Sequence, residues 1–122
     1  MGPRIVHFEI PVKDQSRAKA FYGGLFGWGF EEVPEMGDYT LVSCDERGPN
    51  GGLLTPANPM TGILTYIDVA DVGVAQERAE KLGAEVVKGR SPVPGVGWFS
   101  ILKDTEGNEF AVWQDDETAG LS

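Results

Sequence analysis

Hydrophobic and polar positions repeat one pattern twice along the chain. The first copy opens with a β-prone run at residues 5–10, and Pro11 limits how far this strand continues as an interior one. Asp14 or Ser16 can then cap a helix, because a short side-chain oxygen accepts an orphan backbone N–H. Apolar residues recur at helical spacing after this cap, at Ala18, Phe21, Tyr22 and Leu25. Gly27 is expected to end the helix.

The second copy has the same order of signals. A strand is expected at residues 63–69, Asp71 is the expected helix cap, and Gly83 is the expected end of the helix. The helical stripe consists of Val74, Ala75, Arg78, Ala79 and Leu82. The copies are offset by 56 or 57 residues, close to half the chain. Two long repeats predict a duplicated supersecondary unit, since a solenoid needs at least three.

The remaining segments complete each half as β-α-β-β-β. Further strands are expected at residues 27–33, 39–44, 51–55, 84–88, 98–103 and 109–114. Residues 91–97 hold two prolines and two glycines and are expected to form a loop, and residues 115–122 a frayed polar tail. The predicted fold is therefore α+β, a single domain over residues 1–122. It consists of module 1 (about 4–55) and module 2 (about 62–114), joined by a linker with Pro56, Asn58, Pro59 and Gly62.

Composition excludes some classes of function. The 122 residues are 41% hydrophobic and 24% charged, as in ordinary globular proteins. A net charge of −9 argues against nucleic-acid partners, because phosphate backbones are held mainly by Lys and Arg. No apolar run approaches the length of a membrane span, and the N-terminus has no signal pattern, so cytoplasmic residence is expected. The single cysteine, Cys44, excludes an internal disulfide.

Several motifs in this order resemble the vicinal oxygen chelate superfamily, which includes glyoxalase I, extradiol dioxygenases and bleomycin-resistance proteins. The matching segments are HFEIPVKD at 7–14, AFY at 20–22, LFGW at 25–28, DVADV at 68–72, LGA at 82–84 and DTEGNEF at 104–110. Thr105 replaces the proline usual in the last motif. The resemblance implies two tandem βαβββ modules whose curved mixed sheets form a cleft, and a homodimer.

The resemblance also implies where metal ligands would lie. The ligand on the first strand lies seven residues before the helix-capping Asp, and His7 fits that position. The same rule in the second module gives Leu64, and the position four residues after the turn Gly107 is Ala111. Gly51 and Gly52 begin a strand without a carboxylate and are expected to permit close backbone approach. A catalytic divalent site generally needs about three protein ligands, so we expect neither metal nor cofactor.

A displaced metal site is the alternative, built from His7, Glu9 and Glu109. Because side chains alternate across a strand, Glu9 shares the face of His7, and Tyr66 shares that of Leu64. By the same rule Glu109 and Trp113 share the face of Ala111. The candidate ligand-binding residues are therefore His7, Leu64, Tyr66, Trp98, Glu109, Ala111 and Trp113, with His7, Tyr66 and Trp113 expected to face one cavity. His7 and Glu9 are the candidate catalytic residues.

Three functions follow from these residues. The first is a metal-independent protein that binds an apolar or aromatic small molecule in its cleft. The second is a glyoxalase-like lyase or isomerase, or a dioxygenase-related enzyme, that uses His7 and a nearby carboxylate with or without a non-standard metal site. The third is a subunit whose cleft only packs against a partner protein.

Overall fold

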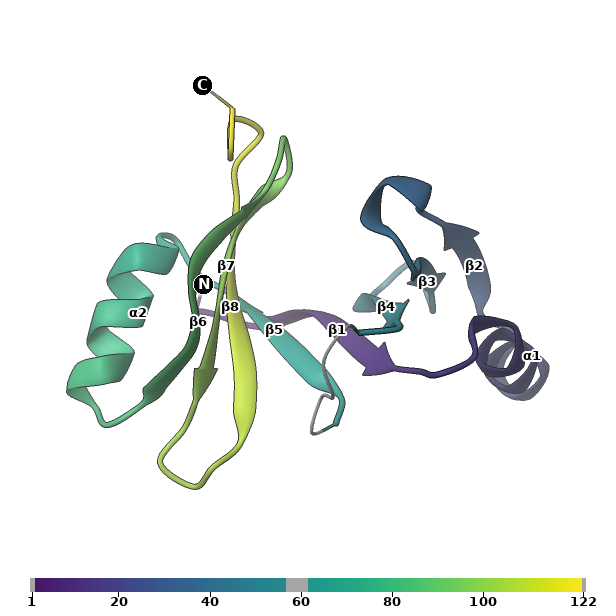
Figure 1. Ribbon diagram of the computed structural model, residues 1–122, viewed down its shortest axis with the longest axis horizontal. Coiled ribbons are helices and arrows are strands. Elements are labelled where there is room, and N and C mark those ends of the chain that lie inside the picture. Colours follow the sequence, from purple (N-terminus) through teal and green to yellow (C-terminus); the bar gives the residue numbers. More distant parts are fainter. Residues whose placement is uncertain (1, 57–61, 122) are drawn as a thin grey trace. The chain divides into compact units, whose positions relative to one another are not determined.

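The computed structural model describes residues 2–56 and 62–121, and these form two compact units. The N-terminal unit is Val6–Thr65, and the C-terminal unit is Tyr66–Ser122 together with Met1–Ile5. Figure 1 labels the helices and strands of both units. Most of the expected linker, at residues 57–61, lies outside the described residues.

The N-terminal unit contains one βαβββ module. Its elements are β1 (Ile5–Pro11), α1 (Gln15–Phe26), β2 (Gly29–Glu32), the 3-10 helix η1 (Pro34–Met36), β3 (Tyr39–Ser43) and β4 (Asn50–Leu54). The strand order is β2-β3-β4-β1. β1 pairs in parallel with β4, and the other two pairings are antiparallel.

The C-terminal unit repeats this arrangement. Its elements are β5 (Leu64–Asp68), α2 (Val72–Lys81), β6 (Glu85–Val93), β7 (Gly97–Lys103) and β8 (Glu109–Asp115). The strand order is β5-β8-β7-β6, and the first strand again pairs in parallel with the last, β5 with β8. β6 with β7 and β7 with β8 are antiparallel. The predicted α+β class and the βαβββ order of both halves are confirmed.

The helix boundaries follow the sequence signals. The Asp14 carboxylate accepts from the Arg17 N–H at 3.0 Å, and the Asp71 carboxylate accepts from the Val74 N–H at 3.0 Å. Asp14, rather than Ser16, is therefore the cap of α1. Gly27 ends α1 with φ 72°, and Gly83 follows α2 with φ 105°. Both glycines adopt the left-handed conformation that residues with a Cβ avoid. Among the described residues, neither helix is long and apolar enough to cross a membrane.

Two segments expected to be irregular are ordered. Residues 91–93 extend β6 and pair with β7, Pro92 lying opposite Trp98. Pro92 is tolerated because β6 is an outer strand, where a missing N–H breaks no ladder bond on the open side. The expected frayed tail instead folds back: Ala119 is buried, and its carbonyl accepts from the Gly95 N–H at 2.9 Å. The expected loop is therefore confirmed only for residues 94–96, and the expectation of a frayed tail was wrong, because composition alone does not show the neighbouring strand.

Each unit has one face covered by its helix. In the N-terminal unit, Ile10, Val42 and Leu53 form a buried cluster against which Ala18 and Tyr22 of α1 pack. In the C-terminal unit the corresponding cluster is Val72, Leu102 and Val112, with Ala75 and Ala79 of α2 packed against it. Because side chains alternate, residues between these positions on the strands lie on the opposite face. We call this the helix-free face of each unit.

Replacing Gly27 by alanine is expected to lower the free energy of unfolding by about 1 kcal/mol, because φ 72° strains a residue with a Cβ. The added methyl group has no heavy atom within 4 Å, so the cost is conformational. Gly24 is the matched control: it lies inside α1, its Cβ would also have open space, and alanine there should stabilise the protein. Urea denaturation compares the variants. A Gly27→Ala protein as stable as the wild type would contradict the cap assignment.

Candidate functional site

The helix-free face of the N-terminal unit brings His7, Glu9 and Tyr39 together. His7 Nε2 lies 2.9 Å from the Tyr39 hydroxyl oxygen and 3.9 Å from Glu9 Oε2. Glu9 and Tyr39 are buried, whereas His7 is partly exposed. His7 and Glu9 therefore share a face, as the alternation along β1 predicts, and β3 supplies the phenol that joins them.

The pKa shifts indicate how protons are arranged in this cluster. Burial, the charge of Glu9 and a hydrogen bond to Glu9 raise the pKa of Tyr39 far above its usual range. Tyr39 therefore keeps its proton, and its hydroxyl donates a hydrogen bond to the Glu9 carboxylate. Since the hydroxyl has one hydrogen, the His7 Nε2–H is the donor to the Tyr39 oxygen. Burial lowers the pKa of His7, opposed by the charge of Glu9, so His7 is neutral near pH 7 with its other nitrogen, Nδ1, unprotonated.

Gly52 makes room for Tyr39. A Cβ at Gly52 would lie 2.1 Å from the Tyr39 hydroxyl oxygen and 2.3 Å from the ring carbon that bears it. Gly51 does the same on the opposite face, where a Cβ would lie 2.5 Å from the Phe8 ring. The close backbone approach expected at these glycines occurs at Gly51, where the Phe8 carbonyl oxygen would lie 2.6 Å from a Cβ, whereas at Gly52 the close neighbour is the Tyr39 side chain. Sequence reasoning missed Tyr39, and the adjacent glycines in β4 were the available signal.

The helix-free face of the C-terminal unit carries an aromatic surface, formed by Tyr66, Phe99 and Trp113. The ring centroid of Tyr66 lies 6.5 Å from that of Phe99 and 6.5 Å from that of Trp113, and the second pair is edge-to-face. Phe99 and Trp113 pair in register across β7 and β8, and both are partly exposed. The Trp113 ring crosses Gly97, where a Cβ would lie 2.4 Å from it. Trp113 Nε1 donates to the Asp115 carboxylate at 2.8 Å.

Trp98 does not belong to this aromatic surface. It packs with the helix-covered cluster of Val72, Leu102 and Val112. Its indole N–H donates to Asp116 at 2.9 Å, and the Arg90 guanidinium stacks 3.6 Å from its ring centroid. The expectation that Trp98 joins Tyr66 and Trp113 was wrong, because its place in β7 directs it to the opposite face from Phe99.

The other candidate positions carry few metal-binding atoms. Leu64 and Ala111 are buried aliphatic residues in β5 and β8, and Glu109 pairs with Lys103 across β7 and β8. Glu9 and Tyr66 occupy corresponding positions, each two residues after a ligand position of its module. Glu9 pairs with Gly52 and Tyr66 pairs with Ala111, so Gly52 is the equivalent of Ala111 in the first module. The family's four metal-ligand positions are therefore occupied by His7, Gly52, Leu64 and Ala111. Of these four, His7 alone has a side chain that can coordinate a metal ion. No group of three or more His, Cys, Asp or Glu suited to a metal occurs among the residues described.

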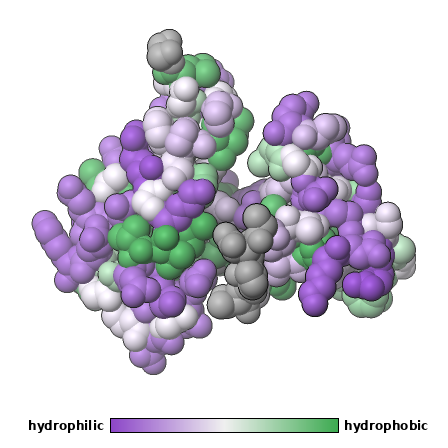
Figure 2. All heavy atoms as spheres, viewed as in Figure 1, coloured by the Kyte–Doolittle hydropathy of each residue, from purple (hydrophilic) through white to green (hydrophobic). Residues whose placement is uncertain are grey.

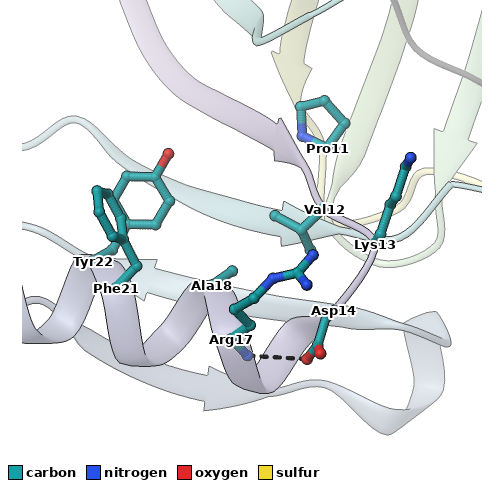
Figure 3. A pocket seen from close by; sticks show the side chains of 8 residues that line it. All are labelled: Pro11, Val12, Lys13, Asp14, Arg17, Ala18, Phe21 and Tyr22. Carbon is teal, nitrogen blue, oxygen red and sulfur yellow. Dashed lines mark hydrogen bonds between the residues drawn. The ribbon is translucent and has the colours of Figure 1, made fainter.

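A shallow groove of about 360 Å³ lies elsewhere, at the start of α1 (Figure 3). Its lining runs from the end of β1 to the second turn of the helix and comprises Pro11, Val12, Lys13, Asp14, Arg17, Ala18, Phe21 and Tyr22. The Asp14 carboxylate in this groove is engaged in capping the helix. None of the candidate residues from the sequence lines the groove, and the aromatic surface remains the better candidate site.

Comparisons with known proteins agree with the fold. The family model described as "Bleomycin resistance protein-like N-terminal" matches residues 4–44. A glyoxylase-like domain-containing protein of Didymella fabae is 30% identical over 117 residues, which cover 89% of this chain and 91% of the relative. The glyoxylase-type protein CFP32 of Mycobacterium bovis is 27% identical over 121 residues, covering 93% of this chain. The chain spans about half the length of that relative, 46%.

A solved structure shows the same architecture. A member of the glyoxalase/bleomycin resistance protein/dioxygenase superfamily from Vibrio splendidus 12B01 superposes with a TM-score of 0.69 at 15% identity. The match covers 93% of this chain and all of that one, 100%. At this identity the likeness concerns the fold alone.

Proposed function

Because the chain belongs to the glyoxalase/bleomycin-resistance family of the vicinal oxygen chelate superfamily, we propose that it binds an apolar or aromatic small molecule without a metal ion. The family resemblance expected from the sequence is thereby confirmed. The family includes proteins named for drug resistance and proteins named for glyoxalase chemistry, so both binding and catalysis are compatible with the fold.

The observation that carries the proposal is the aromatic surface of Tyr66, Phe99 and Trp113. Three rings from three strands lie on a face that no helix of their unit covers. Aromatic rings contribute large apolar area with little rotamer entropy, and they favour stacked or edge-to-face contacts with a flat ligand. The Trp113 ring is fixed by its hydrogen bond to Asp115 and by its position over Gly97, so it is preorganised for such a contact.

The residues at the family's ligand positions do not fit a divalent ion. No metal-coordinating side-chain atom is present at Leu64, Ala111 or Gly52. An aliphatic side chain, or the hydrogen of glycine, cannot replace a carboxylate or an imidazole as a metal ligand. The alternative site from His7, Glu9 and Glu109 is disfavoured, because Glu9 already accepts a hydrogen bond from the Tyr39 hydroxyl and His7 Nε2 donates to the Tyr39 oxygen. We therefore derive no step through a metal.

Protein treated with a chelator is expected to keep its unfolding temperature and its affinity for 2-naphthamide, a neutral aromatic probe. Thermal unfolding with and without the probe measures both, because a compound that binds the folded state raises the apparent stability. Elemental analysis after purification without a tag is the control. Stoichiometric zinc, nickel or iron whose removal lowers the unfolding temperature or abolishes probe binding would overturn metal independence.

A second function, glyoxalase-like catalysis, is favoured by the His7–Tyr39–Glu9 cluster. A neutral His7 held by a hydrogen bond can act as a general base, and Tyr39 can hold it in one tautomer. Glu9 then acts through Tyr39 as a positioning residue. Recovery of a bound compound chemically unchanged after long incubation separates binding from catalysis.

Three expectations from the sequence stay predictions. The first is a cavity shared by His7 of the N-terminal unit and Tyr66 and Trp113 of the C-terminal unit. Assembly as a homodimer and residence in the cytoplasm are likewise part of the proposal.

A further inference from the structure

We propose that the ligand of the aromatic surface carries a negative charge, and that Lys88 binds it. This inference rests on the proposed function and specifies its ligand class, an aromatic or apolar body with a carboxylate or a similar anionic group.

Lys88 belongs to the same face as the aromatic surface. It pairs with Ile101 across β6 and β7, and Ile101 pairs in turn with Ala111 of β8. Residues paired in register share a face, and Phe99 is two residues from Ile101, so Lys88 lies beside the aromatic rings. The Lys88 ammonium is in fact placed over the Phe99 ring, 5.5 Å from its centroid. Figure 1 shows β6 and β7 running side by side.

The charge of Lys88 is not neutralised by a carboxylate in the part of the chain that the structure describes. The ion pairs found there join Lys19 to Glu32, Arg47 to Asp45 and Lys103 to Glu85, besides the His7–Glu9 contact. Lys103 also lies on the helix-free face, but Glu85 takes up its charge at 3.6 Å. Lys88 is therefore a cation on this face that remains available to a ligand.

Arg90, two residues further along β6, provides the contrast. A register shift between Lys88 and Ser91 interrupts the alternation along β6. The Arg90 guanidinium therefore stacks on a ring of the helix-covered side, that of Trp98. There Asp116 accepts the indole N–H of Trp98. Hydrogen bonds from Thr118 and Trp98 lower the pKa of Asp116, and the charge of Arg90 adds to this effect. Arg90 is thus part of a satisfied structural cluster, whereas Lys88 combines a cation with rings on the face proposed to bind.

Asp115 fixes the orientation of an anionic ligand. Its carboxylate accepts from Trp113 at the end of the aromatic surface away from Lys88. Lys88 is aligned with Ala111 of β8 through Ile101 of β7. Asp115 lies four residues further along β8 than Ala111, a distance of about 13 Å in an extended strand. An anionic group is repelled near Asp115 and attracted near Lys88, so the ligand's ring should lie over the partly exposed Trp113 with its charge toward β6.

The test compares 2-naphthoate with 2-naphthamide, which have the same rings but differ in charge, by calorimetric titration at physiological salt. Wild-type protein is expected to bind 2-naphthoate about five-fold more tightly, as for a partly exposed ion pair. Lys88→Met keeps much of the aliphatic stem and removes the charge, so it should abolish this preference while 2-naphthamide binds as before. Arg90→Met is the matched control and should leave the preference unchanged.

The outcomes separate this inference from the proposed function. Equal binding of the two probes by the wild type, or a preference that survives in Lys88→Met, would overturn the role of Lys88 and leave aromatic binding intact. Absence of binding by either probe would overturn the proposed function, and the inference with it. Loss of the preference in Arg90→Met alone would assign the anion to the other face and contradict the proposal.

Discussion

Replacing Gly52 by alanine is expected to destabilise the protein by about 1–3 kcal/mol, the range found when a methyl group is forced into a packed site. The sign is informative, because alanine normally stabilises a strand relative to glycine. The added Cβ would lie 2.1 Å from the Tyr39 hydroxyl oxygen, so the ring must leave its place and the His7–Tyr39 hydrogen bond must break. Urea denaturation measures the loss.

Two further variants make this result specific. Gly29 in β2 is the matched control, because a Cβ there makes only an ordinary contact, 3.8 Å from that of Ser43, and alanine should cost nothing. In a Tyr39→Ala background the cost of Gly52→Ala should fall toward zero, since the ring that the methyl group displaces is absent. A Gly52→Ala protein as stable as the wild type would show that Tyr39 does not cross β4 at this position.

Replacing Trp113 by alanine is expected to weaken binding of 2-naphthamide by tenfold or more. Trp113 is the largest of the three rings, it is partly exposed, and its orientation is fixed by Asp115. Its partial exposure should keep the stability loss below the 3–5 kcal/mol typical of a buried tryptophan. Calorimetric titration gives the affinity, and denaturation gives the stability.

The control for the Trp113 variant is a substitution of Trp98, the tryptophan in β7. Trp98→Phe alters the helix-covered face, so it should reduce stability and leave probe affinity unchanged. Unchanged affinity in Trp113→Ala, or a larger loss in Trp98→Phe, would place the ligand away from the aromatic surface.

Local signals in the sequence predicted the fold well. The caps Asp14 and Asp71 and the terminating glycines Gly27 and Gly83 act within a few residues of themselves, so their roles can be read without knowledge of neighbours. Alternation likewise placed His7 with Glu9, because a strand fixes the faces of its own residues. Composition adds little beyond this, because apolar side chains also remain exposed, among them Phe21 and Leu25 of α1. Figure 2 shows apolar residues at the surface of both units.

Features that depend on a partner strand could not be predicted in this way. Tyr39 reaches His7 only because the register of β3 and β4 sets its ring across Gly52. Pro92 can belong to β6 because that strand is paired on one side only, with β7. Ala119 is buried where its carbonyl accepts a hydrogen bond from the Gly95 N–H. Trp98 and Phe99 are adjacent in sequence and lie on opposite faces, so a choice between them required the position of α2.

The most direct test of the account is a titration of the 15N-labelled protein with 2-naphthamide, followed through the three tryptophan indole N–H signals in the NMR spectrum. Trp28 packs with Tyr22 in the N-terminal unit, Trp98 lies on the helix-covered face, and Trp113 belongs to the aromatic surface. The account predicts a saturable shift of the Trp113 signal, with those of Trp28 and Trp98 nearly unmoved. A Trp113 signal that stays in place, or a saturable shift confined to Trp98 or Trp28, would contradict it.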